Sequence, residues 1–71
     1  MVTLVIDKNK KEWVVIGSQK PIRNNNCGQW MLSDINDGSF SPLKRGTIKK
    51  FTGIDLSFED EPIIISFNKW K

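Results

Sequence analysis

The sequence predicts a small, strand-dominated α+β domain: a five-stranded barrel or sheet with one short helix near residues 42–52. The length of 71 residues allows a single globular domain, residues 1–71. Short β-branched and apolar runs, separated by Gly, Pro, Asn and Asp, recur along the chain and favour strands. Only the segment after Pro42 spaces its apolar residues as a helix does.

The first two predicted strands lie in residues 2–6 and 12–16, which are almost entirely apolar. Residues 7–11 between them are polar and turn-prone, so the two strands are expected to form a β-hairpin. Both strands carry apolar side chains on both faces, which is typical of strands in the centre of a sheet. Trp13 is assigned to the core for this reason.

Residues 18–28 form the longest predicted loop, in which Pro21 and three consecutive asparagines favour turns. A loop of this length in a small domain is either a plain connector or a functional segment, and both interpretations stay open here. Residues 29–35 are expected to form the third strand. The Asp-Gly step in residues 36–39 then predicts a turn, after which Phe40 fits a short returning strand.

The predicted helix has Ser41 as its N-cap and Pro42 at its first position, and it ends before Gly53. Residues 54–59 alternate apolar and polar side chains, which predicts a strand with one buried face. Residues 63–67 are the last predicted strand. The resulting order, β-β-β-α-β-β, is that of an OB-like fold.

The residue counts argue against an enzyme. The chain has no histidine, which is the commonest general base near neutral pH and the commonest metal ligand. Its single cysteine, Cys27, cannot form an internal disulfide or a thiolate metal cage. No apolar run approaches the roughly 18 residues that span a bilayer, and the first residues lack the basic start of a signal peptide. A cytoplasmic protein without membrane, metal or small-molecule cofactor is therefore expected.

Two acidic segments have some of the features of metal sites. The run of residues 59–61 offers carboxylate oxygens, but consecutive side chains point in different directions, so a charged turn is favoured. Residues 34–38 have some of the acidic and amide residues that begin a calcium loop. However, Gly38 falls one position early and Arg45 stands where the loop needs a glutamate, so this segment is interpreted as a hairpin turn.

Basic residues gather on the first hairpin, in the long loop and on the predicted helix, and the net charge is +3. Lysines beside exposed aromatic rings hold phosphates while the rings stack on bases. Solubilising lysines that guard strand edges are the alternative interpretation. Three tryptophans exceed the need of so small a core, and tryptophan is enriched at the energetic centres of protein interfaces. The candidate binding residues are Trp30, Lys44, Arg45, Lys49, Lys50, Lys20, Arg23 and Trp70.

The expected function is that of a small non-enzymatic binding protein, a regulator or inhibitor that occupies a partner surface. The foremost partner is nucleic acid or a nucleic-acid-processing protein complex. The alternative is a protein–protein interaction module or inhibitor unrelated to nucleic acid; the oligomeric state is left open. Ile, Lys and Asn supply 24 of the 71 residues. These residue types have AT-rich codons, and the composition is similar to that of small phage and prophage proteins, a likeness that covers no motif.

Overall fold

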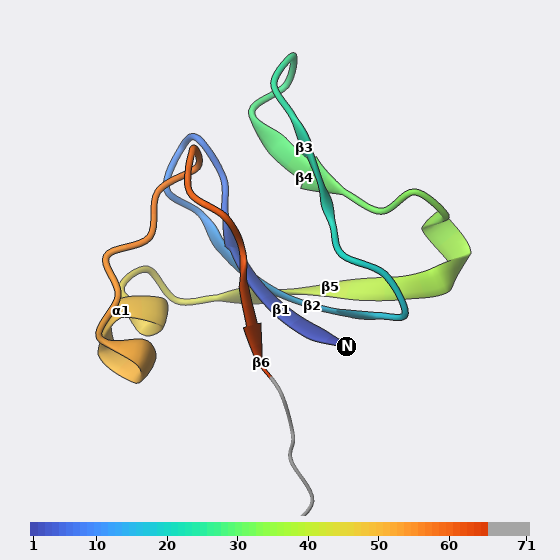
Figure 1. Ribbon diagram of the computed structural model, residues 1–71. Helices are drawn as coiled ribbons and strands as arrows, with labels where there is room; N and C mark the ends of the chain where they lie inside the picture. Colours follow the sequence, from blue (N-terminus) through green and yellow to red (C-terminus); the bar gives the residue numbers. More distant parts are fainter. Residues whose placement is uncertain (66–71) are drawn as a thin grey trace, which may run out of the picture.

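The structure is a computed structural model that describes residues 1–65, and its strands form two antiparallel sheets beside one short helix (Figure 1). The α+β, strand-dominated class predicted from the sequence is therefore confirmed. The elements in chain order are β1 (Val2–Ile6), β2 (Glu12–Gly17), β3 (Ile22–Asn24), β4 (Gln29–Met31), the 3₁₀ helix η1 (Ile35–Asp37), β5 (Gly38–Leu43), α1 (Thr47–Thr52) and β6 (Ile63–Ile65).

The larger sheet has the strand order β5-β2-β1-β6, and each neighbouring pair is antiparallel. The predicted hairpin of residues 2–6 and 12–16 is confirmed, with Leu4 opposite Val14. The smaller sheet is the β3–β4 hairpin, in which Arg23 lies opposite Trp30. Because these sheets are separate and the larger one has four strands, the described residues form neither the five-stranded barrel nor the five-stranded sheet that was expected, and the OB-like order is not confirmed.

One loop prediction and one strand prediction in the first half of the chain were wrong in their extent. Residues 18–28 do not form one long loop, because β3 lies inside this segment and pairs with β4. The third predicted strand, residues 29–35, is only three residues long, since the chain leaves β4 after Met31 and enters η1. In η1 the Asp34 carboxylate accepts a hydrogen bond from the Asn36 backbone N–H, a local cap that competes with a strand.

The predicted helix start was also wrong. Ser41 and Pro42 belong to β5, the strand that returns along β2, and α1 begins only at Thr47. Proline is tolerated on an edge strand, because one side of such a strand needs no backbone donor. Gly46 occupies the N-cap position with a φ of 91°, a left-handed conformation that glycine adopts without a Cβ penalty.

Of the apolar residues in the predicted strand 54–59, Leu56 and Phe58 are buried as expected, but Ile54 is exposed and no strand forms there. Leu56 and Phe58 are both buried, yet they pack into different hydrophobic clusters. A turn follows, in which the Asp60 N–H donates to the Ser57 carbonyl and the Ser57 N–H donates to the Asp60 carboxylate. β6 (Ile63–Ile65) confirms the first three residues of the predicted strand 63–67, and residues 66 and 67 lie outside the described residues.

The core consists of two clusters on opposite faces of the larger sheet. Side chains alternate along a strand, so Leu4 and Ile6 face one side of β1 while Val5 faces the other. The helix-side cluster comprises Leu4, Ile6, Ile48 and Leu56, with partly buried Val14, Leu43, Ile63 and Ile65 around it. The hairpin-side cluster comprises Val5, Val15, Trp30 and Phe58, with partly buried Trp13, Leu32 and Phe40 around it.

Candidate binding surface

The basic residues of the helical segment are held in place by a buried carboxylate from another element. Glu12 on β2 is only 4% exposed. Its Oε2 accepts a hydrogen bond from the Gly46 N–H at 2.7 Å, and its Oε1 accepts one from the Ile48 N–H at 2.9 Å. The first amide groups of a helix lack partners within the helix, and Gly46 has no side chain to supply them. Glu12 therefore fixes the start of α1 against the sheet.

The end of α1 is fixed as well. Gly53 adopts a φ of 77°, and its N–H donates to the Lys49 carbonyl at 2.8 Å. The Thr52 hydroxyl donates to the Ile48 carbonyl, and the Ile48 side chain is buried in the helix-side cluster. A helix of six residues is marginal by itself. These contacts hold the backbone of α1 in place, and so they fix the positions from which its outer side chains extend.

Lys44, Arg45, Lys49 and Lys50 are all exposed at this segment, and we call them the basic cluster. Within residues 1–65, Lys44 and Lys50 make no ion pair, while Lys49 lies 4.0 Å from the exposed carboxylate of Asp55. Ion pairs at the surface contribute little to stability because water and salt screen them. Because only Lys49 of the four has a carboxylate within ion-pair distance in the described residues, the basic cluster presents an excess of positive charge to solvent.

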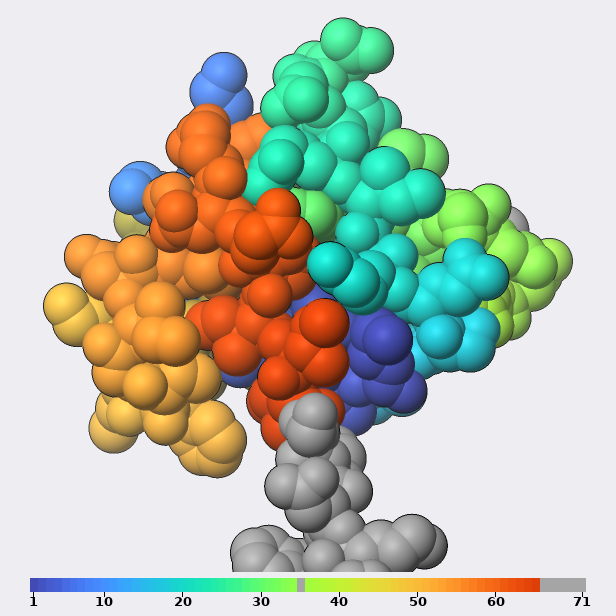
Figure 2. All heavy atoms as spheres, in the orientation of Figure 1, coloured from blue at the N-terminus to red at the C-terminus, as the bar shows by residue number. Residues whose placement is uncertain are grey.

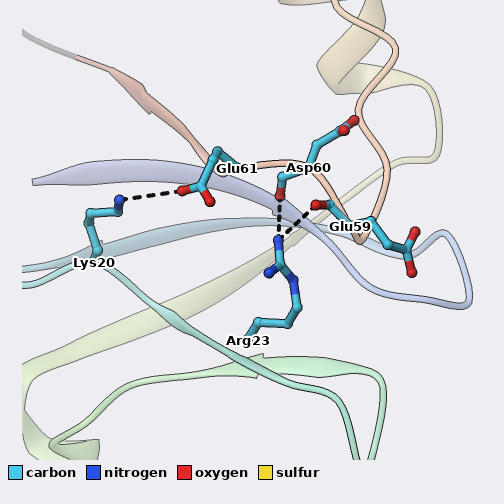
Figure 3. Close-up of polar contacts among 5 residues, drawn as sticks. All are labelled: Lys20, Arg23, Glu59, Asp60 and Glu61. Carbon is cyan, nitrogen blue, oxygen red and sulfur yellow. Dashed lines mark hydrogen bonds and ion pairs between the residues drawn. The ribbon is translucent and has the colours of Figure 1, made fainter.

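Lys20 and Arg23, expected as binding residues in the long loop, are instead engaged with the acidic turn (Figure 3). The Arg23 guanidinium donates to the carbonyls of Phe58, Glu59 and Asp60 at 2.9 to 3.0 Å. Lys20 Nζ lies 3.6 Å from Glu61 Oε1. Figure 2 shows the consequence at the surface, where residues 57–62 lie side by side with residues 19–24. Arg23 thus joins β3 to the turn before β6.

The Trp30 ring is not at the surface where it was expected. Trp30 is 8% exposed, and its Nε1–H donates to the Ile6 carbonyl at 2.9 Å. It meets the Phe58 ring edge-on at 5.8 Å, and the Arg23 guanidinium lies over it at 5.0 Å. A ring enclosed in this way cannot stack on a partner unless the core opens, so Trp30 serves the fold.

The other two tryptophans differ in what the structure shows. Trp13, assigned to the core, is partly buried at the margin of the hairpin-side cluster. Its Nε1–H donates to the buried Asp7 carboxylate at 2.8 Å, and Lys11 Nζ lies 4.7 Å from its ring centre. Trp70, the second candidate stacking ring, lies outside the described residues.

Phe51 is the surface aromatic that the sequence interpretation missed. It is 82% exposed, between Lys50 and Thr52 on α1. It follows Ile48 by three residues, a spacing at which two side chains are neighbours on a helix surface. Because α1 has only six residues, Ile48 alone reaches the core, and Phe51 stands at the rim. A large aromatic directly after two lysines was the signal that could have revealed it.

An open apolar groove of about 280 Å³ lies beside Phe51. Its floor and walls come from strands β1, β2, β5 and β6 and from α1. The residues that line it are Leu4, Val14, Leu43, Thr47, Ile48, Phe51 and Ile65. The groove exists because the short helix covers only part of its face of the larger sheet.

Comparison with known proteins returns no matching family model, no matching curated protein and no matching solved structure. Within residues 1–65, no helix is long and apolar enough to cross a membrane.

Proposed function

We propose that this protein is a non-enzymatic binding protein of the cytoplasm that occupies a partner surface on nucleic acid or on a nucleic-acid-processing protein complex, as a regulator or inhibitor. The observation that supports the proposal is the basic cluster, four exposed cations within residues 44–50 on a segment fixed at both ends. A fixed group of like charges raises the local concentration of a polyanion and speeds its encounter.

In this proposal the protein acts by covering a surface of its partner and catalyses no reaction. The lysines of the basic cluster are point charges with flexible stems, which suits contact with phosphates or carboxylates without a fixed orientation. Arg45 is partly restrained, since its Nη2 donates to the Asn9 carbonyl at 3.4 Å. A partner bound here would meet the outer side of α1 and residues 44–46, which lead into it.

A protein–protein interaction module unrelated to nucleic acid is the second candidate. The observation that favours it is the exposed Phe51 beside an apolar groove. Apolar surface of this kind is typical of protein interaction sites.

Two lysine variants with the same net charge test the proposal. One replaces Lys44, Lys49 and Lys50 with glutamine, and the matched control replaces Lys8, Lys10 and Lys11 on the first hairpin. Binding to a labelled single-stranded oligonucleotide is measured by fluorescence anisotropy over a series of salt concentrations. If three phosphate contacts are lost, the slope of log K against log salt falls by about 2 in the first variant. The control retains the slope.

Equal loss in both variants would show that net charge alone governs the interaction, and the assignment of the surface would be wrong. A pull-down from cell lysate, with and without nuclease, then separates the two kinds of partner. A protein retained after nuclease treatment by the wild-type chain, and lost by the variant at Lys44, Lys49 and Lys50, indicates the protein complex. Retention of nucleic acid alone indicates direct binding.

A further inference from the structure

We propose that the groove between Phe51 and the larger sheet binds an acidic protein segment, which inserts a large apolar side chain into the groove and places carboxylates against the basic cluster. The inference rests on the proposed function, because it takes the basic cluster as the surface that faces the partner. The inference adds two things to the proposed function: the partner is an acidic protein segment, and Phe51 is the residue of this chain that its apolar side chain contacts.

The groove is suited to a side chain rather than to a small-molecule ligand. Its volume of about 280 Å³ is at the lower limit of the roughly 300–1,000 Å³ that is usual for ligand pockets, so it has room for one large side chain and little more. Apart from Thr47, the residues that line it are aliphatic or aromatic. The Thr47 hydroxyl already donates to the Lys44 carbonyl at 2.6 Å. An occupant therefore gains from apolar burial and finds few groups for hydrogen bonding.

The sheet face around the groove remains partly uncovered among the described residues. α1 buries Ile48 against this face but leaves Val14, Leu43 and Ile65 only partly covered. Phe51 stands over the same side with 82% of its surface in water. A partner side chain placed between Phe51 and the strands would remove both surfaces from water together, which is the main source of affinity at small interfaces.

The charges around the groove specify the rest of the partner. Lys44 precedes α1 and Lys50 directly precedes Phe51, and neither has an ion-pair partner within residues 1–65. An apolar peptide without charges would form no ion pairs with these two lysines. A peptide with carboxylates on both sides of the apolar side chain in the groove would form them. Complementary charge of this kind speeds association and selects the partner.

A polynucleotide fits the groove less well than a protein segment. A base could stack on Phe51, but its polar edges would then face the apolar floor without hydrogen-bond partners, which is costly. Binding of single strands usually relies on several aromatic rings along a basic track. On this surface the described residues provide one.

The test uses three fluorescent peptides and the full-length chain. The first peptide has a Leu-Phe-Leu centre flanked by glutamates, the second replaces the glutamates with glutamine, and the third replaces the centre with alanines. Anisotropy titrations at low salt are expected to show tightest binding to the first peptide. Phe51→Ala is expected to weaken that binding at least about tenfold, which corresponds to about 1.4 kcal/mol. Ile22→Ala, which shortens an exposed apolar side chain on β3, is the matched control and leaves it unchanged.

The other possible occupants give different results. If a single-stranded oligonucleotide displaces the peptide and its own affinity depends on Phe51, the groove serves nucleic acid and the inference is wrong. A self-associated chain that becomes monomeric on Phe51→Ala, measured by analytical ultracentrifugation, would identify a second copy and would also overturn it. Peptide binding that survives Phe51→Ala but is lost in the variant at Lys44, Lys49 and Lys50 would retain the proposed function and exclude the groove.

Discussion

Glu12 and Ile48 are joined by a hydrogen bond in which the Ile48 backbone N–H donates to Glu12 Oε1 at 2.9 Å, deep in the structure. The second oxygen accepts the Gly46 N–H at 2.7 Å. A strand residue thus provides the cap of a helix that lies far along the chain. The start of the segment that carries the basic cluster is therefore held by this one side chain.

Substitution of Glu12 is expected to destabilise the protein and to loosen α1. Glu12→Ala leaves two amide groups without an acceptor and should lower the free energy of unfolding by about 3 kcal/mol, since hydrogen bonds to charged groups are worth roughly 1.5–3 kcal/mol each. Glu12→Gln keeps one acceptor oxygen and should cost about 1–2 kcal/mol on the same scale. Urea denaturation measures both.

Hydrogen exchange then locates the effect of Glu12→Gln. Faster exchange is expected at the amides of Gly46 and Ile48, with the β1–β2 pairing less affected. If the amides of α1 kept their protection while β1 lost its own, Glu12 would support the sheet and not the helix.

Arg23→Lys is expected to release the turn at residues 58–60. Lysine carries a compact ammonium group in place of the planar guanidinium, so it cannot serve all three carbonyl oxygens at once. We expect a loss of about 1–3 kcal/mol in the free energy of unfolding. Limited proteolysis should cut within residues 54–62 sooner than in the wild type.

Lys20→Gln is the control for Arg23→Lys, because it removes only the exposed ion pair with Glu61. Its effect should stay within about 0.5 kcal/mol, as is usual for surface ion pairs. An equal effect of both variants would mean that positive charge near the acidic turn, rather than the Arg23 hydrogen bonds, holds the turn.

Substitution of Trp30 is predicted to lower the stability of the fold, whereas substitution of Phe51 is predicted to weaken binding and leave stability almost unchanged. Trp30→Ala should cost about 3–5 kcal/mol, the usual cost of truncating a buried aromatic ring, and should unfold much of the population. Phe51→Ala should change the free energy of unfolding by less than about 0.5 kcal/mol, because the side chain is exposed. Thermal denaturation followed by circular dichroism tests the pair. A large loss of stability in Phe51→Ala would show that this ring belongs to the core.

Gly38→Ala is expected to break the contact between β5 and β2. A Cβ at this position would collide with the Ile16 carbonyl oxygen and would stand 3.0 Å from the Gly17 Cα. Both obstacles are backbone atoms, so the strands must move apart, and we expect a loss of at least about 2 kcal/mol. Ser39→Ala, one residue further along the strand at an exposed position, should have little effect. Similar stabilities of the two variants in urea would contradict this steric argument.

The elements predicted from the sequence are those that local pattern determines. Residues 2–6 and 12–16 have long β-branched runs around a polar turn, and their hairpin is confirmed. β3 was missed because its three residues contain a single apolar side chain, Ile22, and its pairing depends on β4. The start of the helix was predicted too early because its cap has a long-range origin. The carboxylate that caps α1 comes from Glu12, and no residue near Thr47 in the sequence indicates this.

The candidate site was predictable in its charge but not in its geometry. The basic cluster follows directly from composition along residues 44–50, and its residues are exposed. The roles of Trp30 and Arg23 were not predictable, because they depend on packing against Phe58, a residue far along the chain. The alternation of residues 54–59 correctly indicated that Leu56 and Phe58 are buried. It did not require a strand, because an irregular segment can also place one side chain in the cluster on each face of the sheet.

The position of β1 between β2 and β6 has a consequence for the order of folding. The β1–β2 hairpin closes a short loop and can form early, whereas the β1–β6 pairing, with Leu4 opposite Ile63, must wait until residue 65 has been synthesised. Closure of so long a loop is entropically slow. Until then the outer edge of β1 is an open strand edge that invites pairing with other chains. A nascent chain of this protein is therefore expected to be open to aggregation along this edge of β1 until β6 leaves the ribosome.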